Sequence, residues 1–302
     1  MSSSPRPPVV LDCDGAVAPL PGELRIALQA EQEALRFGCS LARMQALRST
    51  LDAQLPPPAA HGTVWMGSGD FHHLSWPLIA RQAESAARPL RVVVLDNHPD
   101  NMRYWFGVHC GSWVRRVAAL PGVAEVLVVG ITSPDIGAAH WWENHLGPLR
   151  RGRLQYWSTG VDTRWAQRLG LGAAFRSFDS VQVLAGALCQ HLQHDPRPTY
   201  LSIDKDVLSP DTVRTNWDQG QLTEPQLMAV IAALHGQLVG SDITGEVSVW
   251  RYRSWLKRWL SAGDGQDATG PDAATLAQWQ AAQNALNQRL LAPLAAARHF
   301  AR

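Results

Sequence analysis

The sequence lacks the features of a nucleic-acid-binding, membrane-spanning or disordered protein. Its 302 residues carry 27 basic and 26 acidic side chains, so there is no basic excess that would attract nucleic acid. No apolar run approaches the roughly 20 residues that a bilayer-spanning helix needs. Charged residues are only 18% of the chain, whereas hydrophobic residues are 46%, which is enough to build a core. We therefore expect a globular protein without a nucleic-acid or membrane partner.

Paired cysteines and an apolar leader are also missing. Residues 1–8 are rich in Ser and Pro and contain no apolar core of a secretory signal. The four cysteines form no CxxC pair, which argues against a zinc knuckle or a disulfide framework; they are Cys13, Cys39, Cys110 and Cys189. These absences favour a reduced protein in the cytoplasm.

Short apolar runs alternate with longer amphipathic stretches along the chain. Runs such as Val92–Leu95 and Val126–Val129 are typical of strands buried on both faces, as in a parallel sheet covered by helices. We predict an α/β fold, a three-layer α/β/α sandwich with a mostly parallel central sheet. The expected strands are Val9–Asp12, Thr63–Gly67, Arg91–Asp96, Ala124–Gly130, Thr199–Asp204 and Leu238–Val249, and the expected helices are Glu23–Phe37, Leu41–Leu51, Leu74–Ala87, Val181–Gln193, a helix from Thr223, and Ala274–Ala297.

The pattern indicates one domain over residues 1–302. Within it, residues 1–60 form an N-terminal segment without a functional assignment, which Pro56–Pro58 sets apart. Residues 262–302 are expected to form a mobile Gly- and Asp-rich loop followed by the last helix.

Three expected strand ends carry clusters of Asp and His. Asp96, His98 and Asp100 follow one apolar strand, and Asp204 and Asp206 follow another. A third strand is followed by Gly67–His73, which contains an Asp and two adjacent histidines. In open α/β sheets, ligands bind at the carboxyl ends of the strands.

Alternate residues of an extended segment point the same way, so these carboxylates and imidazoles are expected to face one another. Four carboxylates packed together would repel and raise one another's pKa unless divalent cations lay between them. Mixed carboxylate and imidazole ligands suit Mn, Fe or Zn better than Ca. A single DxD is usually a turn or a solvated strand end, but the three clusters together favour a metal site.

These motifs resemble those of the ureohydrolase superfamily, the arginases and agmatinases. The segment Leu95–Asp100 is similar to the family's DAHxD motif, and Ser202–Pro210 is similar to its SxDxDxxDP motif. Gly220–Thr223 follows at the distance of the family's GGLT-like sequence. The resemblance covers residues 60 to 250 and implies the arginase-like fold.

The resemblance implies a binuclear site holding two Mn²⁺ ions, with Fe or Zn not excluded. Asp96 and Asp204 would bridge the ions; His72 and Asp100 would complete one site, and His98 and Asp206 the other. The family's nucleophile is a hydroxide between the ions, which Asp100 would orient.

The resemblance also implies an activity and two further catalytic residues. The reaction would be hydrolysis of a guanidino or amidine carbon–nitrogen bond in a small-molecule substrate, with urea or a urea-like product, by a homo-oligomer. His109, within Gly107–Gly111, would deliver a proton to the departing amine. Glu246, within Asp242–Val247, would hold the guanidinium group.

The chain departs from the family pattern around the substrate. The segment Gly67–His73 is similar to the family's first motif, which is GGDHS-like, but Phe71 is inserted between Asp70 and the histidines. Either His72 or His73 is therefore the ligand, and we choose His72 because the residues after it align better with the helix start. One extra residue separates Asp242 from Glu246. The family's small-residue loop is replaced by Thr212–Gly220, which contains a tryptophan that could stack on a planar or cationic substrate.

Three other interpretations stay open. A single-zinc amide hydrolase of the deacetylase type has a related fold but needs fewer ligands. A non-catalytic metal-binding relative is compatible with the altered loop. Val9–Gly15 is similar to the DxDG motif of phosphatases in which a strand-end aspartate, here Asp12, attacks phosphate, although partner motifs are missing.

Overall fold

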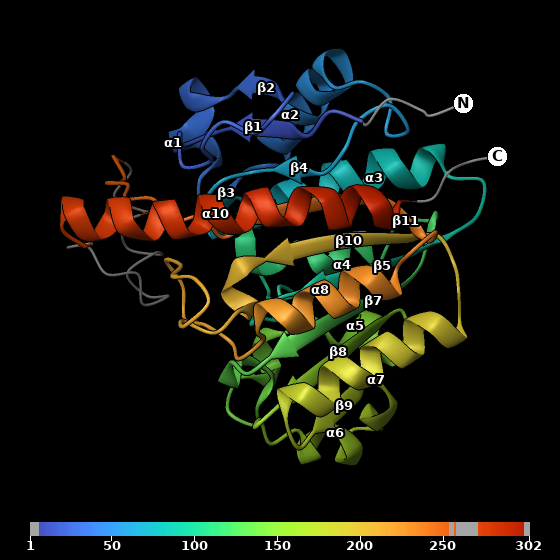
Figure 1. Ribbon diagram of the computed structural model, residues 1–302. Coiled ribbons are helices and arrows are strands. Elements are labelled where there is room, and N and C mark those ends of the chain that lie inside the picture. The colour runs from blue at the N-terminus through green and yellow to red at the C-terminus, as the bar shows by residue number, and fades with distance from the viewer. Residues whose placement is uncertain (1–5, 254–256, 258–270, 299–302) are drawn as a thin grey trace.

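The central feature of the fold is a parallel sheet. The computed structural model describes residues 6–253, 257 and 271–298 (Figure 1). In this part of the chain, nine parallel strands follow the order β2-β1-β4-β11-β10-β5-β7-β8-β9. Their bounds are β1 Val9–Asp12, β2 Leu24–Ala27, β4 Val64–Trp65, β5 Leu90–Leu95, β7 Val123–Ile131, β8 Leu154–Thr159, β9 Phe175–Phe178, β10 Thr199–Asp204 and β11 Leu238–Thr244. The predicted α/β fold with a mostly parallel sheet is confirmed.

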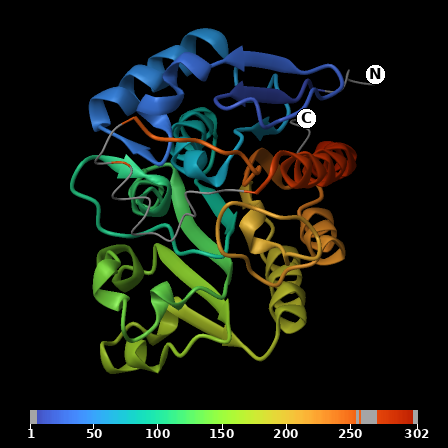
Figure 2. The ribbon, with the colours of Figure 1, turned by 90° about the vertical axis from the view of Figure 1, so that its left-hand side faces the viewer.

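Helices cover both faces of this sheet (Figure 2). Because side chains alternate along a strand, Val92 and Val94 of β5 enter one core while Val93 and Leu95 enter the other. The second core includes residues of α7, α8 and α10, and the first includes residues of the helices on the opposite face. The helices are α1 Gln32–Leu35, α2 Leu41–Gln54, α3 Ser75–Ser85, α4 Val114–Val117, α5 Leu146–Arg150, α6 Arg164–Arg168, α7 Val181–His194, α8 Glu224–Ala233 and α10 Ala273–Ala297.

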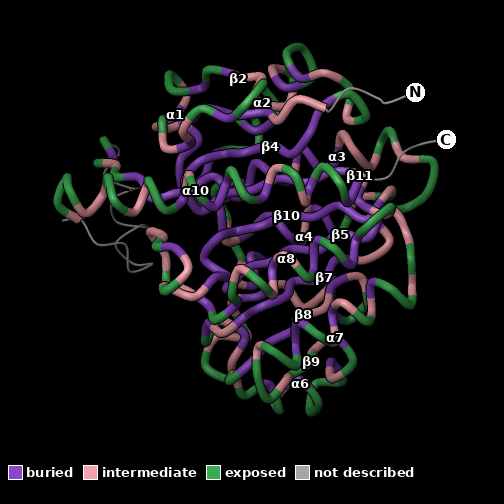
Figure 3. Tube along the Cα trace, viewed as in Figure 1, coloured by how far each residue is buried: buried purple, intermediate pink, exposed green. Residues whose placement is uncertain are grey.

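The burial pattern follows from this layering. The central strands run through the buried interior, and exposed positions gather on the outer faces of the helices (Figure 3). The predicted start of α8 is present, because Gln226 Oε1 accepts a hydrogen bond from the Thr223 backbone N–H at 2.8 Å. No helix among the described residues is long and apolar enough to cross a membrane.

The N-terminal part of the chain differs from the prediction of one helix over Glu23–Phe37. Leu24–Ala27 instead forms β2, which pairs in parallel with β1 at the sheet edge, and only Gln32–Leu35 is α-helical. Hydrogen bonding to the sheet outweighs the helical pattern at this position. Strands β8 and β9 were not predicted, and β11 ends at Thr244 rather than at Val249. Most of the predicted mobile loop lies outside the described residues.

The order of the strands places one opening next to β5. From β5 the chain runs outward through β7, β8 and β9, and it then returns to form β10 on the other side of β5 and continues away from β5 to β11. Such a switch leaves a crevice at the carboxyl ends of the strands. The polar clusters predicted as ligands follow β4, β5 and β10 at this edge.

Candidate metal centre and its cavity

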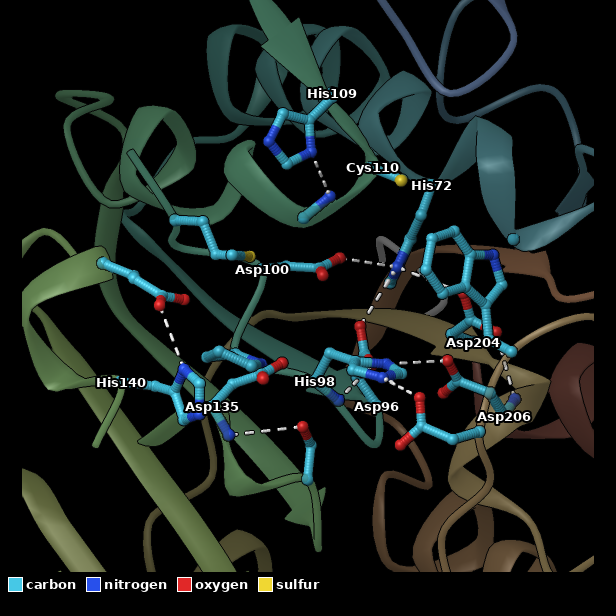
Figure 4. A pocket seen from close by; sticks show the side chains of 18 of the residues that line it. His72, Asp96, His98, Asp100, His109, Cys110, Asp135, His140, Asp204 and Asp206 are labelled. Carbon is cyan, nitrogen blue, oxygen red and sulfur yellow. Dashed lines mark hydrogen bonds and ion pairs between the residues drawn. The ribbon is translucent and has the colours of Figure 1, made fainter. Parts of the chain in front are cut away.

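Strand register brings the two main aspartate clusters together. Ile203 of β10 pairs with Leu95 of β5, so Asp204 and Asp96 leave the sheet side by side. A short 3₁₀ helix, Gly69–Leu74, follows β4 and brings His72 over the same strand ends (Figure 4). The three segments that the sequence connects with metal chemistry therefore meet in one place.

His72 forms one half of the cluster. Its Nδ1 atom lies 2.9 Å from Asp100 Oδ2, 3.1 Å from Asp96 Oδ2 and 3.4 Å from Asp204 Oδ2. All four side chains are buried. The neighbouring His73 is also buried but does not line the cavity, and burial lowers its pKa to about 3. Of the two histidines, only His72 faces the carboxylates.

His98 forms the other half. Its Nδ1 atom lies 3.0 Å from Asp206 Oδ2 and 3.5 Å from Asp96 Oδ1. Asp96 therefore contacts both halves, as a bridging ligand must. The backbone N–H of Asp206 donates to Asp204 Oδ1 at 3.0 Å, which fixes the second pair of aspartates relative to each other.

Asp100 is held by its backbone and by a neighbouring indole. Its φ angle of 46° lies in the left-handed region, which a non-glycine residue adopts at a local cost. Trp113 Nε1 donates to Asp100 Oδ2 at 2.6 Å. This geometry points the carboxylate at His72 and not away from the site.

The charges of the cluster are unbalanced without a cation. Burial, with added repulsion from Asp96, raises the pKa of Asp100 and that of Asp206 to about 7. Burial and the charge of Asp206 raise the pKa of Asp204 as well. Burial raises the pKa of Asp96, but the nearby His72 and His98 together lower it by more, so the pKa lies below its usual value. Asp96 Oδ2 is buried and, among the described residues, accepts no hydrogen bond of good geometry, although His72 Nδ1 lies 3.1 Å away. Divalent cations would resolve this crowding, so the donor set fits them.

A cavity of about 550 Å³ opens above these residues. Its wall includes both histidines of the cluster and all four aspartates. The other residues that line it are Gly69, Pro99, Met102, His109, Cys110, Gly111, Ser133, Pro134, Asp135, His140, Glu143, Trp217 and Asp218. This volume is in the range of small-molecule sites.

His109 lies in the cavity wall but apart from the metal cluster (Figure 4). Its Nδ1 atom accepts a hydrogen bond from the Gly111 backbone N–H at 2.9 Å, which leaves the proton of the neutral ring on Nε2. Its ring stacks on Phe37, with 5.6 Å between the ring centroids. Burial lowers the pKa of His109 to about 4, so the ring is neutral at pH 7.

Glu246 is not where the resemblance implies. It does not line the cavity, and its carboxylate accepts hydrogen bonds from Lys205 Nζ at 2.5 Å and from Asn287 Nδ2 at 2.7 Å. Gly245, which precedes it, has a φ of 94° that turns the backbone after β11. The turn leaves Glu246 in a buried ion pair beneath α10.

The structure also shows residues that the sequence did not single out. Asp135 follows β7, and the rule that ligands lie at carboxyl strand ends could have found it. Asp218 contacts His98, but its place depends on the path of a loop and has no signal in the sequence. Asp12, the candidate phosphatase nucleophile, contacts Arg25 at 3.1 Å and Gln29 at 2.6 Å and does not line the cavity.

Comparison with known proteins agrees with this architecture. The structure is similar to proclavaminate amidino hydrolase from Streptomyces clavuligerus, with a TM-score of 0.54 and 19% identity over 97% of this chain and 93% of that chain. It is also similar to a formiminoglutamase variant from Trypanosoma cruzi solved with Mn²⁺, with a TM-score of 0.51 and 11% identity over 91% and 74% of the two chains. Both likenesses concern the fold.

Sequence comparison gives the family. An uncharacterized protein from Thermotoga maritima is 28% identical over 190 residues, which cover 63% of this chain and 60% of that protein. The match therefore spans less than two thirds of the relative's length. The model of the arginase family matches residues 41–248, which is more than half of the chain. The chain belongs to the arginase family.

Proposed function

We propose that this chain is a binuclear metal-dependent hydrolase that cleaves a carbon–nitrogen bond of a guanidino or related amidine compound and releases urea or a urea-like product. The observation that carries the proposal is the convergence of two histidines and four aspartates, from three strand ends, on the floor of one cavity. Asp96 belongs to both candidate ligand groups, which favours two ions over one.

The ligands would divide into two sets. His72 and Asp100 would hold one ion and His98 and Asp206 the other, with Asp96 and Asp204 shared. Two divalent cations, when bound, lower the pKa of a shared water and polarise the group under attack. The donor set suits Mn²⁺ and also accepts Fe or Zn.

The other polar residues of the site would handle protons and orientation. Asp100, fixed by Trp113, would accept a hydrogen bond from the attacking water and orient it. His109 is neutral and its Nδ1 atom is occupied by the Gly111 N–H, so its Nε2–H would donate a hydrogen bond to the substrate, and the proton that the departing amine takes up would come from the attacking water through Asp100. Glu246 has no part in this scheme, because its carboxylate is paired with Lys205.

Metal stoichiometry tests the proposal directly. Protein reconstituted with Mn²⁺ should contain two ions per chain by elemental analysis, and Asp204→Ala should lose them while keeping its circular dichroism spectrum. Asp211→Ala is the matched control, because Asp211 is an exposed aspartate of the neighbouring loop and does not line the cavity.

Turnover is then measured as urea or amine release from a panel of guanidino and amidine compounds. Activity that is lost in Asp204→Ala and kept in Asp211→Ala would support the proposal. One tightly bound zinc with hydrolysis of acetyl amides would replace it with the single-zinc alternative. Two bound ions without turnover of any compound would favour a non-catalytic relative.

A further inference from the structure

Asp218 lies at the exposed edge of the cavity, yet its carboxylate is aimed at a candidate metal ligand. Asp218 Oδ1 lies 2.8 Å from His98 Nε2, the ring nitrogen opposite the one that faces Asp206. The side chain of Asp218 is 64% exposed, whereas that of His98 is 16% exposed. A surface loop therefore reaches the candidate metal site through Asp218.

The backbone and side chain of Asp218 are both fixed. Asn97 Nδ2 donates to Asp218 Oδ2 at 3.0 Å and to the Asp218 backbone oxygen at 3.1 Å. Asn97 Oδ1 in turn accepts from the Thr132 hydroxyl at 2.6 Å, which ties the asparagine to the end of β7. Since Asn97 stands between Asp96 and His98 in the chain, the loop is attached to the metal motif itself.

The preceding residue attaches the same loop from the other side. Trp217 Nε1 donates to Asp70 Oδ1 at 3.2 Å, and the Trp217 ring meets His98 edge-on with 6.1 Å between centroids. A Cβ atom on Gly69 would lie 3.1 Å from Trp217 Cδ1 and 3.1 Å from Asp204 Oδ2, so a larger residue here would have to push the indole or the carboxylate aside by a few tenths of an ångström. The loop is thus packed against the cluster and not merely next to it.

The two histidines of the cluster differ in the partner of their second ring nitrogen. His72 Nε2 lies 3.0 Å from the neutral hydroxyl of Ser202, in the buried core. His98 Nε2 lies against a charged carboxylate that comes from the loop. A carboxylate that accepts from one ring nitrogen holds the proton there, leaves a lone pair on the other, and makes that nitrogen a better ligand.

We propose that Asp218 is a positioning residue that keeps the proton of His98 on Nε2 and thereby presents Nδ1 to the ion held with Asp206. This inference rests on the proposed metal function. It assigns to the altered loop a role in the affinity of one of the two ions. The other ion, held with His72 and Asp100, does not depend on this contact.

The test measures metal affinity and not activity. Mn²⁺ is titrated into metal-free wild type, Asp218→Asn, Asp218→Ala and Asp211→Asn by isothermal calorimetry, and the coupled two-ion spectrum is followed by electron paramagnetic resonance. Asp211→Asn removes a charge from an exposed position of the adjoining segment without touching a candidate ligand. Thermal melting of the metal-free proteins shows whether any variant is damaged.

We expect the Asp218 variants to weaken one Mn²⁺ site by about 10- to 100-fold, which is the usual effect of a lost carboxylate partner on a histidine ligand. Asp218→Ala should weaken it at least as much as Asp218→Asn, and the other site should be unchanged. The electron paramagnetic resonance signal of the coupled Mn²⁺ pair should then appear only at a higher Mn²⁺ concentration. The metal-free variants should melt at the same temperature as the metal-free wild type.

The outcomes separate this inference from the proposed function. If both Asp218 variants bound two Mn²⁺ ions with wild-type affinities, the positioning role would be overturned and the proposed binuclear site would be unaffected. An equal loss at both sites together with lower metal-free melting would also overturn it, because it would indicate a structural role. A wild-type protein that binds no Mn²⁺, Fe²⁺ or Zn²⁺ would instead remove the proposed function.

Discussion

The floor and the rim of the cavity are built in different ways. The floor, defined as the six candidate ligands, comes from strand ends and from the short segments directly after them, which include the 3₁₀ helices Gly69–Leu74 and Lys205–Val207, and hydrogen bonds of the sheet fix where these segments begin. The rim, defined as Trp217, Asp218, Asp135 and His109, comes from segments outside the nine-stranded sheet: a loop, a 3₁₀ helix and a short strand, Val108–His109. The motifs that resemble the family supply the floor, whereas the loop that contributes Trp217 and Asp218 departs from the family pattern.

The largest effect should separate the two adjacent histidines of the floor. His72→Asn removes a ring nitrogen 2.9 Å from Asp100, and we expect it to abolish binding of one ion and to lower activity by roughly 10³-fold. The matched variant His73→Asn disturbs a buried side chain outside the cavity. It should lower stability by about 2 kcal/mol and keep both ions.

Elemental analysis and urea release on both variants check this difference. If His73→Asn lost metal while His72→Asn kept it, the ligand would be the other histidine and the register of the first motif would be wrong. If both variants kept two ions, the floor would not be a metal site.

The next effect concerns Glu246. If this residue bound substrate, it would belong to the rim of the cavity. Because its partner Lys205 is fully buried, Glu246→Gln leaves an unpaired charge inside the protein, and we expect a loss of about 3 kcal/mol in unfolding free energy. KM should stay at the wild-type value. Urea denaturation and steady-state kinetics measure the two quantities.

The double variant Lys205→Met/Glu246→Gln is the control. It removes both charges and should recover part of the lost stability, since no uncompensated ion remains. A single variant with normal stability but a KM raised many-fold would show that Glu246 reaches the substrate after all.

Most of the floor could be predicted from the sequence because it depends on local pattern. Apolar runs such as Val92–Leu95 identify buried strands, and the residues directly after them lie at one edge of a parallel sheet. The positions of Asp96 and Asp204 can therefore be predicted from their strands alone, without knowing the path of any loop. The helix predicted over Glu23–Phe37 failed because pairing of β2 with β1 is a long-range contact that periodicity does not report.

The rim could not be predicted in the same way. The backbone turn at Gly245 directs Glu246 away from the cavity and into an ion pair with Lys205, and no local pattern in the sequence reveals which way the backbone turns. Asp218 is recognisable as a partner of His98 only when the path of its loop is known. Contacts between loops depend on the whole fold, whereas strand ends depend on their own strand.

A smaller effect should come from Trp217, which faces the cavity from the rim. Trp217→Leu removes an aromatic wall, and we expect KM to rise by about tenfold for a cationic or planar substrate with little change in kcat. Trp105→Leu is the control, because Trp105 is 87% exposed and does not line the cavity. An unchanged KM in Trp217→Leu would show that substrate does not contact this wall.

The smallest effect is a pH dependence of stability that belongs to the rim histidine. Burial lowers the pKa of His109 from 6.5 to about 4, so between these values the unfolded chain binds a proton that the folded chain does not. The contribution of His109 to the free energy of unfolding is therefore largest above pH 6.5 and decreases as the pH drops toward 4. At pH 6 this group has lowered the free energy of unfolding by about 0.8 kcal/mol.

His109→Gln should remove the contribution of His109 to the decrease in unfolding free energy between pH 8 and pH 6. The contributions of His61 and His73, whose pKa values burial lowers to about 4 and about 3, should remain. Phe37→Leu is the matched control, since it removes the ring stacked on His109 without removing a titrating group. Unfolding free energies from urea denaturation at pH 8 and pH 6 give the slopes. An equal slope in wild type and His109→Gln would mean that His109 takes up its proton at the same pH in the folded and the unfolded chain. At pH 6 most of its rings would then meet the cavity as cations and not as the neutral group that the hydrogen bond from Gly111 requires.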